Sequence, residues 1–227
     1  MSQRLLNKRV LVTQATEYMG PAIVELFREE GALVVASTED LRAPEAAAHV
    51  VHSAGAIDVL IVNLAQPPTA QAATAISDDA WQTMFDALST PLMRLVRAAL
   101  PDMLARRAGK IVAMTSAAPL RGMPGFATYC AARGAQNAFV RAVGLEAAAH
   151  NVQVNAIAQN YVKNPTYYPE DLVTTERFLA HVARHVPAGR VAEGRESAEL
   201  ALFLASNHSD FMVGQVIPFA GGWVTGG

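Results

Sequence analysis

The chain is poor in cysteine and has no concentration of basic charge. Cys130 is the single cysteine among 227 residues, so no internal disulfide can form. No cluster of cysteine and histidine has the spacing of a metal site. Lysine and arginine number 18 against 20 acidic residues, without a basic run or basic–aromatic interleaving. We therefore expect no disulfide, no metal and no nucleic-acid partner.

The sequence also lacks a long hydrophobic run. A helix that crosses a bilayer needs about 20 consecutive apolar residues, and no segment approaches that length. Residues 1–9 lack the apolar core of a signal peptide. With 52% hydrophobic residues, the chain is long enough to bury one core and short for two. We expect one cytoplasmic domain over residues 1–227, without a membrane partner.

Short β-branched runs alternate with longer helical patterns along the chain. Strands are expected near 9–13, 32–36, 58–62, 110–114, 152–157 and 215–219, and helices near 20–30, 78–88, 90–107, 127–149 and 195–205. Continuously apolar strands are typical of a parallel sheet buried on both faces. The pattern predicts an α/β fold with a doubly wound, Rossmann-like parallel sheet. Residues 159–172 have little regular pattern and are expected at a pocket rim.

Ser116, Tyr129 and Arg133 form a Ser-x12-Tyr-x3-Arg set. Tyr129 and Arg133 are four apart at the start of a predicted helix, which places them on one face with Cβ atoms about 5–6 Å apart. A phenol is a poor base at neutral pH, but a neighbouring guanidinium stabilises the phenolate. Ser116 ends a predicted strand, where its hydroxyl can hold a substrate oxygen. The set predicts acid–base chemistry; the alternative is an ordinary helix start and a capping serine.

Several segments carry a resemblance to the short-chain dehydrogenase/reductase superfamily over nearly the whole chain. They are Val59–Asn63, Gly109–Val112, Thr115–Ala117, Tyr129–Arg133, Val154–Ala158, Phe203–Ser206, Gly214-Gln215 and Ala220–Gly222. In dehydrogenases of that superfamily the residue four after the tyrosine is lysine, which also reaches the nicotinamide ribose. Here that residue is Arg133, which carries a bulky planar guanidinium instead of the compact ammonium of lysine.

Glycine is scarce where the resemblance implies a nucleotide site. The superfamily's dehydrogenases carry Thr-Gly-x-x-x-Gly-x-Gly after the first strand, where glycines let backbone amides approach the pyrophosphate. Residues 13–20 read Thr-Gln-Ala-Thr-Glu-Tyr-Met-Gly, so only Gly20 remains of the three glycines. Tyr18 replaces one glycine, and Glu17 adds negative charge where a diphosphate would lie. We expect no nucleotide cofactor; the alternative is a variant loop that still binds NAD.

Three further departures indicate the same loss. The short connection between residues 36 and 58 implies that the helix and strand that help seat the adenosine half are deleted. Leu88 stands where the resemblance places an asparagine of the proton relay. Gln159-Asn160 stands where dehydrogenases have Pro-Gly beside the nicotinamide.

The vacated space is expected to form a small anion site. Its predicted lining is Tyr18, Gln159, Asn160, Tyr161 and Val162. Aromatic edges carry partial positive charge, and loop N–H groups can form an anion-binding nest. The alternative is that these aromatic side chains fill the vacated space as ordinary core.

This combination closely resembles halohydrin dehalogenases, the cofactor-free branch of the superfamily. The resemblance implies that Tyr129 deprotonates a vicinal haloalcohol, Ser116 holds its oxygen, and Arg133 tunes Tyr129, with release of halide and formation of an epoxide. It also implies reverse opening of epoxides by small anions such as azide, cyanide and nitrite, and a homotetramer. From loop position we expect the substrate pocket to include Leu64, Pro67, Pro119, Leu120, Phe126 and Tyr167.

Two other functions stay open at this stage. One is an atypical NAD(P)-dependent reductase, and the other is a non-catalytic small-molecule sensor. His181 and His185 have i, i+4 spacing, but no third ligand is evident, so a solvated helix face is expected. Trp223 is expected to reach a pocket, either its own or a neighbouring subunit's.

Overall fold

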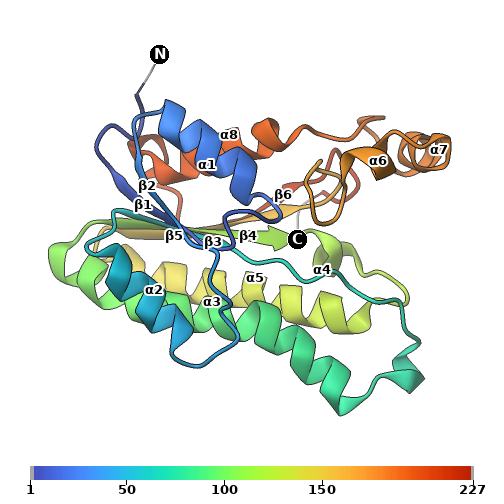
Figure 1. Cartoon of the computed structure of the whole chain (residues 1–227), viewed down its shortest axis with the longest axis horizontal. Helices are drawn as coiled ribbons and strands as arrows, with labels where there is room; N and C mark the ends of the chain where they lie inside the picture. The colour runs from blue at the N-terminus through green and yellow to red at the C-terminus, as the bar shows by residue number, and fades with distance from the viewer. Residues whose placement is uncertain (1–2, 226–227) are drawn as a thin grey trace.

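A computed structural model of the chain describes residues 3–225. Six strands form one parallel sheet in the order β2-β1-β3-β4-β5-β6 (Figure 1). The strands are β1 (Arg9–Val12), β2 (Leu33–Ala36), β3 (Val59–Asn63), β4 (Gly109–Ser116), β5 (Val152–Gln159) and β6 (Val216–Phe219). The helices are α1 (Gly20–Glu29), α2 (Ala46–Ala54), α3 (Asp78–Arg106), α4 (Ala118–Arg121), α5 (Ala127–Ala148), α6 (Glu170–Val173), α7 (Glu176–His185) and α8 (Gly194–Ala205), with short 3₁₀ turns η1 (Ala73–Ala75) and η2 (Asn207–Ser209).

Helices cover both faces of the sheet. Helices α1 and α8 lie on one face, and α2, α3 and α5 lie on the other (Figure 1). Strands β3 and β5 are buried at every position because both of their faces are covered. This arrangement confirms the predicted doubly wound α/β fold. None of the described helices has both the length and the apolar character that crossing a membrane requires.

One long helix replaces the two that the sequence predicts over 78–88 and 90–107. Helix α3 is continuous through Pro91 and Pro101. Proline removes one helical hydrogen bond, but Leu88, Leu92 and Leu95 all bury their side chains in the same core cluster. Burial of this shared stripe outweighs the lost bond, so the helix does not end at the proline.

The connection between β2 and β3 is as short as expected. Helix α2 is the only regular element there within the described chain, and it leads directly into β3. Strand β2 is therefore an edge of the sheet.

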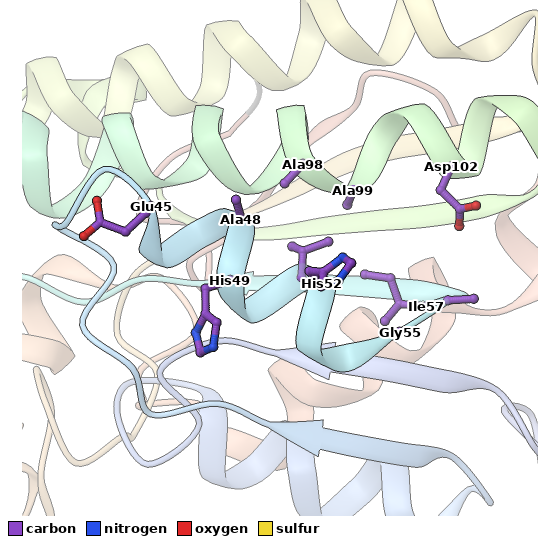
Figure 2. A pocket seen from close by; sticks show the side chains of 11 residues that line it. Glu45, Ala48, His49, His52, Gly55, Ile57, Ala98, Ala99 and Asp102 are labelled. Carbon is purple, nitrogen blue, oxygen red and sulfur yellow. The ribbon is translucent and has the colours of Figure 1, made fainter.

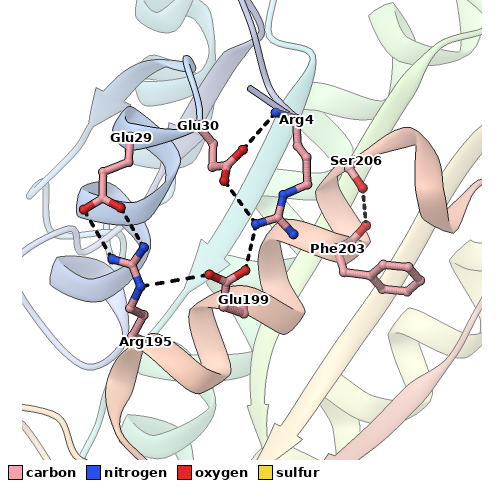
Figure 3. A network of polar contacts seen from close by, with 7 residues as sticks. All are labelled: Arg4, Glu29, Glu30, Arg195, Glu199, Phe203 and Ser206. Carbon is pink, nitrogen blue, oxygen red and sulfur yellow. Dashed lines mark hydrogen bonds and ion pairs between the residues drawn. The ribbon is translucent and has the colours of Figure 1, made fainter. Parts of the chain in front are cut away.

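Ion pairs hold α8 against α1 and the N-terminal segment (Figure 3). Arg195 on α8 bonds Glu29 on α1 at 2.7 Å. Arg4 bonds Glu30 at 3.2 Å and Glu199 at 2.8 Å. The Arg195–Glu29 pair is exposed and contributes little by itself, whereas the Arg4–Glu30 pair is partly buried. Together they fix the lateral position of α8, whose inner face reaches the carboxyl edge of the sheet.

The carboxyl edge of the sheet gathers the chemically interesting residues. Ser116 ends β4 and is in register with Gln159 at the end of β5. Tyr129 lies in the first turn of α5, which follows β4 and α4. Ligands bind at this edge in open α/β sheets because loops of adjacent strands meet there.

Candidate active site

A small cavity of about 80 Å³ lies at the carboxyl edge of β4 and β5. Its lining includes two members of the predicted set, Ser116 and Tyr129, together with Tyr18. The remaining lining residues are Pro68, Ala118, Met123, Gln159, Asn160, Val162, Asn164, Tyr167 and Tyr168. The structure therefore brings together residues that are far apart in the sequence, and no carboxylate is among these lining residues.

Arg133 lies behind the cavity and is completely buried. Its Nη1 donates to Gln136 Oε1 at 3.0 Å and to the Met114 carbonyl at 3.3 Å, and its Nη2 donates to the Leu64 carbonyl at 2.9 Å. Gln136 Nε2 in turn donates to the Leu88 carbonyl at 2.8 Å. These acceptors fix the plane of the guanidinium.

The other partners of Arg133 are two phenols. Its Nε donates to the Tyr129 hydroxyl at 3.2 Å, and its Nη2 donates to the Tyr167 hydroxyl at 3.0 Å. Burial lowers the pKa of Arg133, but the interactions with Tyr129 and Tyr167 raise it by more. The pKa is therefore above its usual value, and the guanidinium stays charged. Among residues 3–225 no carboxylate bonds this cation. Because every acceptor is neutral, the buried charge favours an anion beside it, such as a phenolate.

Ser116 presents a free hydroxyl proton. Its Oγ accepts a hydrogen bond from the Ala118 N–H at 3.1 Å, and its carbonyl accepts one from Asn137 Nδ2 at 3.3 Å. The hydroxyl makes no donation within the described chain, so its proton is available to an oxygen bound in the cavity.

Tyr18 lies in the loop of residues 13–20, which corresponds to the glycine-rich phosphate loop of the superfamily's dehydrogenases. Its φ is 48° and that of Gln14 is 42°, a left-handed conformation that favours glycine. The Tyr18 hydroxyl donates to the Thr115 carbonyl at 2.7 Å, and its ring meets the Tyr167 ring edge-on at 5.1 Å. Burial raises the pKa of Tyr18, so this phenol stays neutral in the cavity wall.

Gln159 and Asn160 supply amide groups to the cavity. Gln159 Oε1 accepts from Ser197 Oγ at 2.6 Å. Asn160 Oδ1 accepts from the Tyr161 N–H at 3.0 Å and from the Tyr168 hydroxyl at 2.5 Å. Within residues 3–225, neither amide nitrogen has an acceptor. The oxygens are occupied, so the donors remain for a ligand.

Val162 adds a backbone donor to the same wall. Its N–H has no acceptor in the described part of the chain, although the neighbouring Lys163 N–H bonds the Ala192 carbonyl at 2.9 Å. The φ of Tyr161 is 54°, which turns the chain sharply after β5. Unpaired N–H groups in such turns bind anions.

The residues present do not fit a dinucleotide. The backbone N–H groups that would meet a pyrophosphate are already bonded: Tyr18 N–H to Thr166 Oγ1 at 2.8 Å and Met19 N–H to Asn63 Oδ1 at 3.2 Å. Gly20 is needed for a different reason, because a Cβ there would lie 2.5 Å from the Ala15 carbonyl oxygen.

The cleft beside this loop is acidic. It measures about 220 Å³, and Glu17, Glu39 and Asp40 are among its lining residues. The one cation in that lining, Arg42, is ion-paired with Asp40 at 2.6 Å. Glu17, on the loop after β1, is the carboxylate of this lining that opposes binding of a diphosphate.

Some predicted pocket residues lie outside the cavity. Tyr161 lines a separate hollow with Arg190, because its ring packs against Trp223 at 5.9 Å and its hydroxyl meets His181 Nε2 at 3.0 Å. Of the predicted substrate residues only Tyr167 lines the cavity. The other five, which do not, are Leu64, Pro67, Pro119, Leu120 and Phe126.

The reason for these differences is side-chain direction. Leu64 points into the core, while Pro67 is exposed. Sequence neighbours Pro68, Ala118 and Met123 line the cavity instead, with Asn164 and Tyr168 from the loop after β5. Loop position indicated the right segments, but the sequence carries no periodic signal for which loop side chain turns inward.

The histidine pair and Trp223 lie beside the site. His181 and His185 stack at 4.4 Å on α7, and residues 3–225 contain no group of three metal-ligating side chains. Trp223 contacts Tyr161 and Arg121 of its own chain, with the Arg121 guanidinium 4.9 Å above the indole.

A larger hollow of about 800 Å³ lies elsewhere, between α2 and α3 (Figure 2). Small side chains such as Ala48 and Ala98 form its walls, with His49, His52 and Asp102 at its rim. It contains no member of the Ser-Tyr-Arg set, so the small cavity is the better candidate for the chemistry.

Comparisons with known proteins divide between reductases and dehalogenases. Residues 10–224 match the family model described as enoyl-(acyl carrier protein) reductase. The 3-oxoacyl-[acyl-carrier-protein] reductase FabG of Vibrio harveyi is 30% identical over 96% of this chain and 98% of its own.

The similar solved structures include a dehalogenation enzyme and a halohydrin dehalogenase. The first is 29% identical with a TM-score of 0.91, covering 97% of this chain and 100% of its own. The second, HheC bound to ethyl (2S)-oxiran-2-ylacetate, is 26% identical with a TM-score of 0.88, covering 96% and 98%. The fold, the family model and the relatives all indicate the same superfamily. The chain belongs to the short-chain dehydrogenase/reductase superfamily.

Proposed function

We propose that this protein is a cofactor-independent halohydrin dehalogenase. It converts vicinal haloalcohols to epoxides with release of halide and a proton, and it opens epoxides with small anions such as azide, cyanide and nitrite. The observation that carries the proposal is the buried guanidinium of Arg133, which bonds Tyr129 at 3.2 Å beside a cavity walled by Tyr18. A dehydrogenase would need a nucleotide in that space.

The proton transfer follows from the contacts of Tyr129 and Ser116. The phenolate of Tyr129, stabilised by Arg133, accepts the proton of the substrate hydroxyl. Ser116 donates its free hydroxyl proton to the same substrate oxygen and orients it. The resulting alkoxide attacks the neighbouring carbon, forms the C–O bond of the epoxide and breaks the carbon–halogen bond. Nucleophile and leaving group share one molecule, so alignment supplies much of the rate enhancement.

The departing halide takes the bonding pair and needs donors. Asn160, Gln159 and Val162 line the cavity. Within the described residues their donors, Asn160 Nδ2, Gln159 Nε2 and the Val162 N–H, have no acceptor. Neutral donors in a partly enclosed site stabilise a developing anion without trapping it as tightly as a full charge would. In the reverse reaction, epoxide opening, the same N–H groups donate hydrogen bonds to the small anionic nucleophile.

The cavity volume favours small substrates. About 80 Å³ is far below the roughly 300–1,000 Å³ typical of sites for larger ligands. Haloalcohols and epoxides of two to four carbons suit it.

The decisive experiment measures halide and proton release from 1,3-dichloro-2-propanol or 2-bromoethanol with no nucleotide added. The wild type is expected to release both in equal amounts, and Tyr129→Phe is expected to lose at least about 100-fold in rate. Cys130→Ser, a neighbouring substitution outside the site, serves as control. Absence of release from several haloalcohols contradicts the proposal.

An atypical reductase is the second candidate, because the curated relatives include reductases such as FabG. It predicts measurable binding of NADH or NADPH by fluorescence titration. A non-catalytic sensor predicts ligand binding without turnover. Glu17 and the bonded N–H groups of the loop disfavour the reductase.

We further propose that the protein is a homotetramer. Large apolar side chains remain exposed on one chain, including Phe211 at 102% and Leu145 at 72%. Singly exposed apolar side chains are ordinary on protein surfaces, so the proposal rests on the family resemblance. Sedimentation equilibrium gives the number of subunits directly.

A further inference from the structure

We propose that Ser197 is a positioning residue that orients Gln159, so that the Gln159 side-chain nitrogen donates a hydrogen bond to the anion in the cavity. This inference rests on the proposed function and deepens it by naming a specific halide donor and the group that directs it. Ser197 belongs to α8, far in sequence from the rest of the site.

The contact between the two side chains is short and enclosed. Ser197 is 0% exposed and Gln159 is 4% exposed, and the distance from Ser197 Oγ to Gln159 Oε1 is 2.6 Å. Gln159 closes β5 directly beside Ser116, its register partner on β4. In a parallel pair, register partners point to the same face of the sheet, so the amide lies on the side where Ser116 presents its hydroxyl.

The amide nitrogen of Gln159 reaches the cavity. It has no acceptor among residues 3–225. Within those residues, Arg4 Nε and Asn137 Oδ1 are the side-chain atoms that are both unpaired and sealed from solvent. Gln159 Nε2 is unpaired but not sealed, so it faces open space, and the cavity is the space that Gln159 lines. A buried donor directed at a cavity needs an acceptor there.

The orientation of this amide decides whether it attracts or repels an anion in the cavity. If the group rotates by half a turn, Oε1 faces the cavity and repels the halide. The hydroxyl of Ser197 donates to Oε1. With an anion in the cavity, this is the orientation in which both ends of the amide are paired, Oε1 with Ser197 and Nε2 with the anion. Removal of the hydroxyl leaves Oε1 without a donor when Nε2 faces the anion, which weakens anion binding without touching Tyr129 or Arg133.

The experiment measures chloride binding by ³⁵Cl NMR line broadening, which needs no turnover. Ser197→Ala is expected to raise the chloride dissociation constant by about 3–10-fold, the loss of roughly one hydrogen bond. Ser197→Thr keeps the hydroxyl and is expected to bind within about twofold of wild type. Ser209→Ala removes another buried hydroxyl, which bonds only backbone carbonyls and Lys110 outside the site, and is expected to leave chloride affinity unchanged.

A second background tests whether Ser197 acts through Gln159. In Gln159→Met, the further change Ser197→Ala is expected to have no effect on chloride affinity, because the amide is already gone. In haloalcohol turnover, Ser197→Ala is expected to weaken product inhibition by halide more than it lowers kcat.

The outcomes separate the inference from the proposed function. If the wild type binds chloride and Ser197→Ala binds it equally well, the inference is wrong and the proposed function stands. An additive loss in the Gln159→Met background also overturns it. If the wild type binds no chloride, both fail.

Discussion

The hydroxyl of Tyr167 accepts hydrogen bonds from Arg133 Nη2 at 3.0 Å and from the Gln66 N–H at 2.9 Å. Arg133 therefore bonds two phenols at once, since its Nε also donates to Tyr129. Burial raises the pKa of Tyr167, which keeps this phenol neutral. Tyr167 thus competes with Tyr129 for the guanidinium without itself becoming the anion.

Tyr167→Phe is expected to shift the half-maximal pH of activity downward. The substitution keeps the ring and removes one acceptor, so more of the Arg133 charge acts on Tyr129. The measurement is the pH profile of kcat/KM, with tyrosinate absorbance at 295 nm as a check without turnover. Tyr168→Phe, whose hydroxyl contacts Asn160 and not Arg133, is the comparison. An unchanged or raised midpoint contradicts the idea of competition.

Arg133→Lys is expected to lower kcat by about 100–1,000-fold, although it restores the superfamily's usual residue. An ammonium cannot bond Leu64, Met114, Gln136 and two phenols together. The unpaired acceptors are expected to cost about 2–3 kcal/mol in the free energy of unfolding. Urea denaturation measures this change in the free energy of unfolding. The same exchange at Arg141, exposed on α5, provides the control and is expected to change stability by less than about 0.5 kcal/mol.

Tyr18→Gly is expected to destabilise the fold by about 2–4 kcal/mol. Glycine relieves the positive φ, worth about 1 kcal/mol, but loss of a buried ring costs about 3–5 kcal/mol. Chloride affinity is expected to fall as well, because the cavity loses a wall. Thermal unfolding and ³⁵Cl NMR test both effects against Tyr18→Phe, which keeps the ring. A gain in stability would show that the ring contributes less than its backbone strain costs.

Glu196→Gln is expected to remove a pH-dependent part of stability. The hydrogen bond from Arg190 lowers the pKa of Glu196 from 4.5 to about 2. A folded pKa below the unfolded value stabilises the fold above pH 4.5, and this contribution is lost as the pH falls toward 2. The pair is exposed, so the difference from wild type is expected to stay below about 1 kcal/mol at pH 7 and to shrink at pH 3. Denaturation at both pH values measures it; an equal difference at both argues against the ion pair.

Local patterns in the sequence determined the fold class. Continuous apolar runs at β3, β4 and β5 predicted a sheet covered on both faces, and this prediction is confirmed. The predicted boundary between two helices near residue 89 was wrong, because α3 continues through Pro91 and its apolar stripe is buried by distant elements that no local pattern reveals.

The sequence by itself also determined which residues could do chemistry. The i, i+4 spacing of Tyr129 and Arg133 follows from helix geometry, and their contact exists for that reason. The replaced glycines of residues 13–20 can likewise be read without a structure.

Tertiary structure alone decided which neighbours complete the site. Ser197 meets Gln159 across 38 positions and Tyr167 meets Arg133 across 34, distances over which no sequence period operates. Tyr161 turns away from the cavity because Trp223 and His181 hold its ring and hydroxyl. Spacing sets which side chains share a helix or strand face, but the direction of a loop side chain depends on what packs against it.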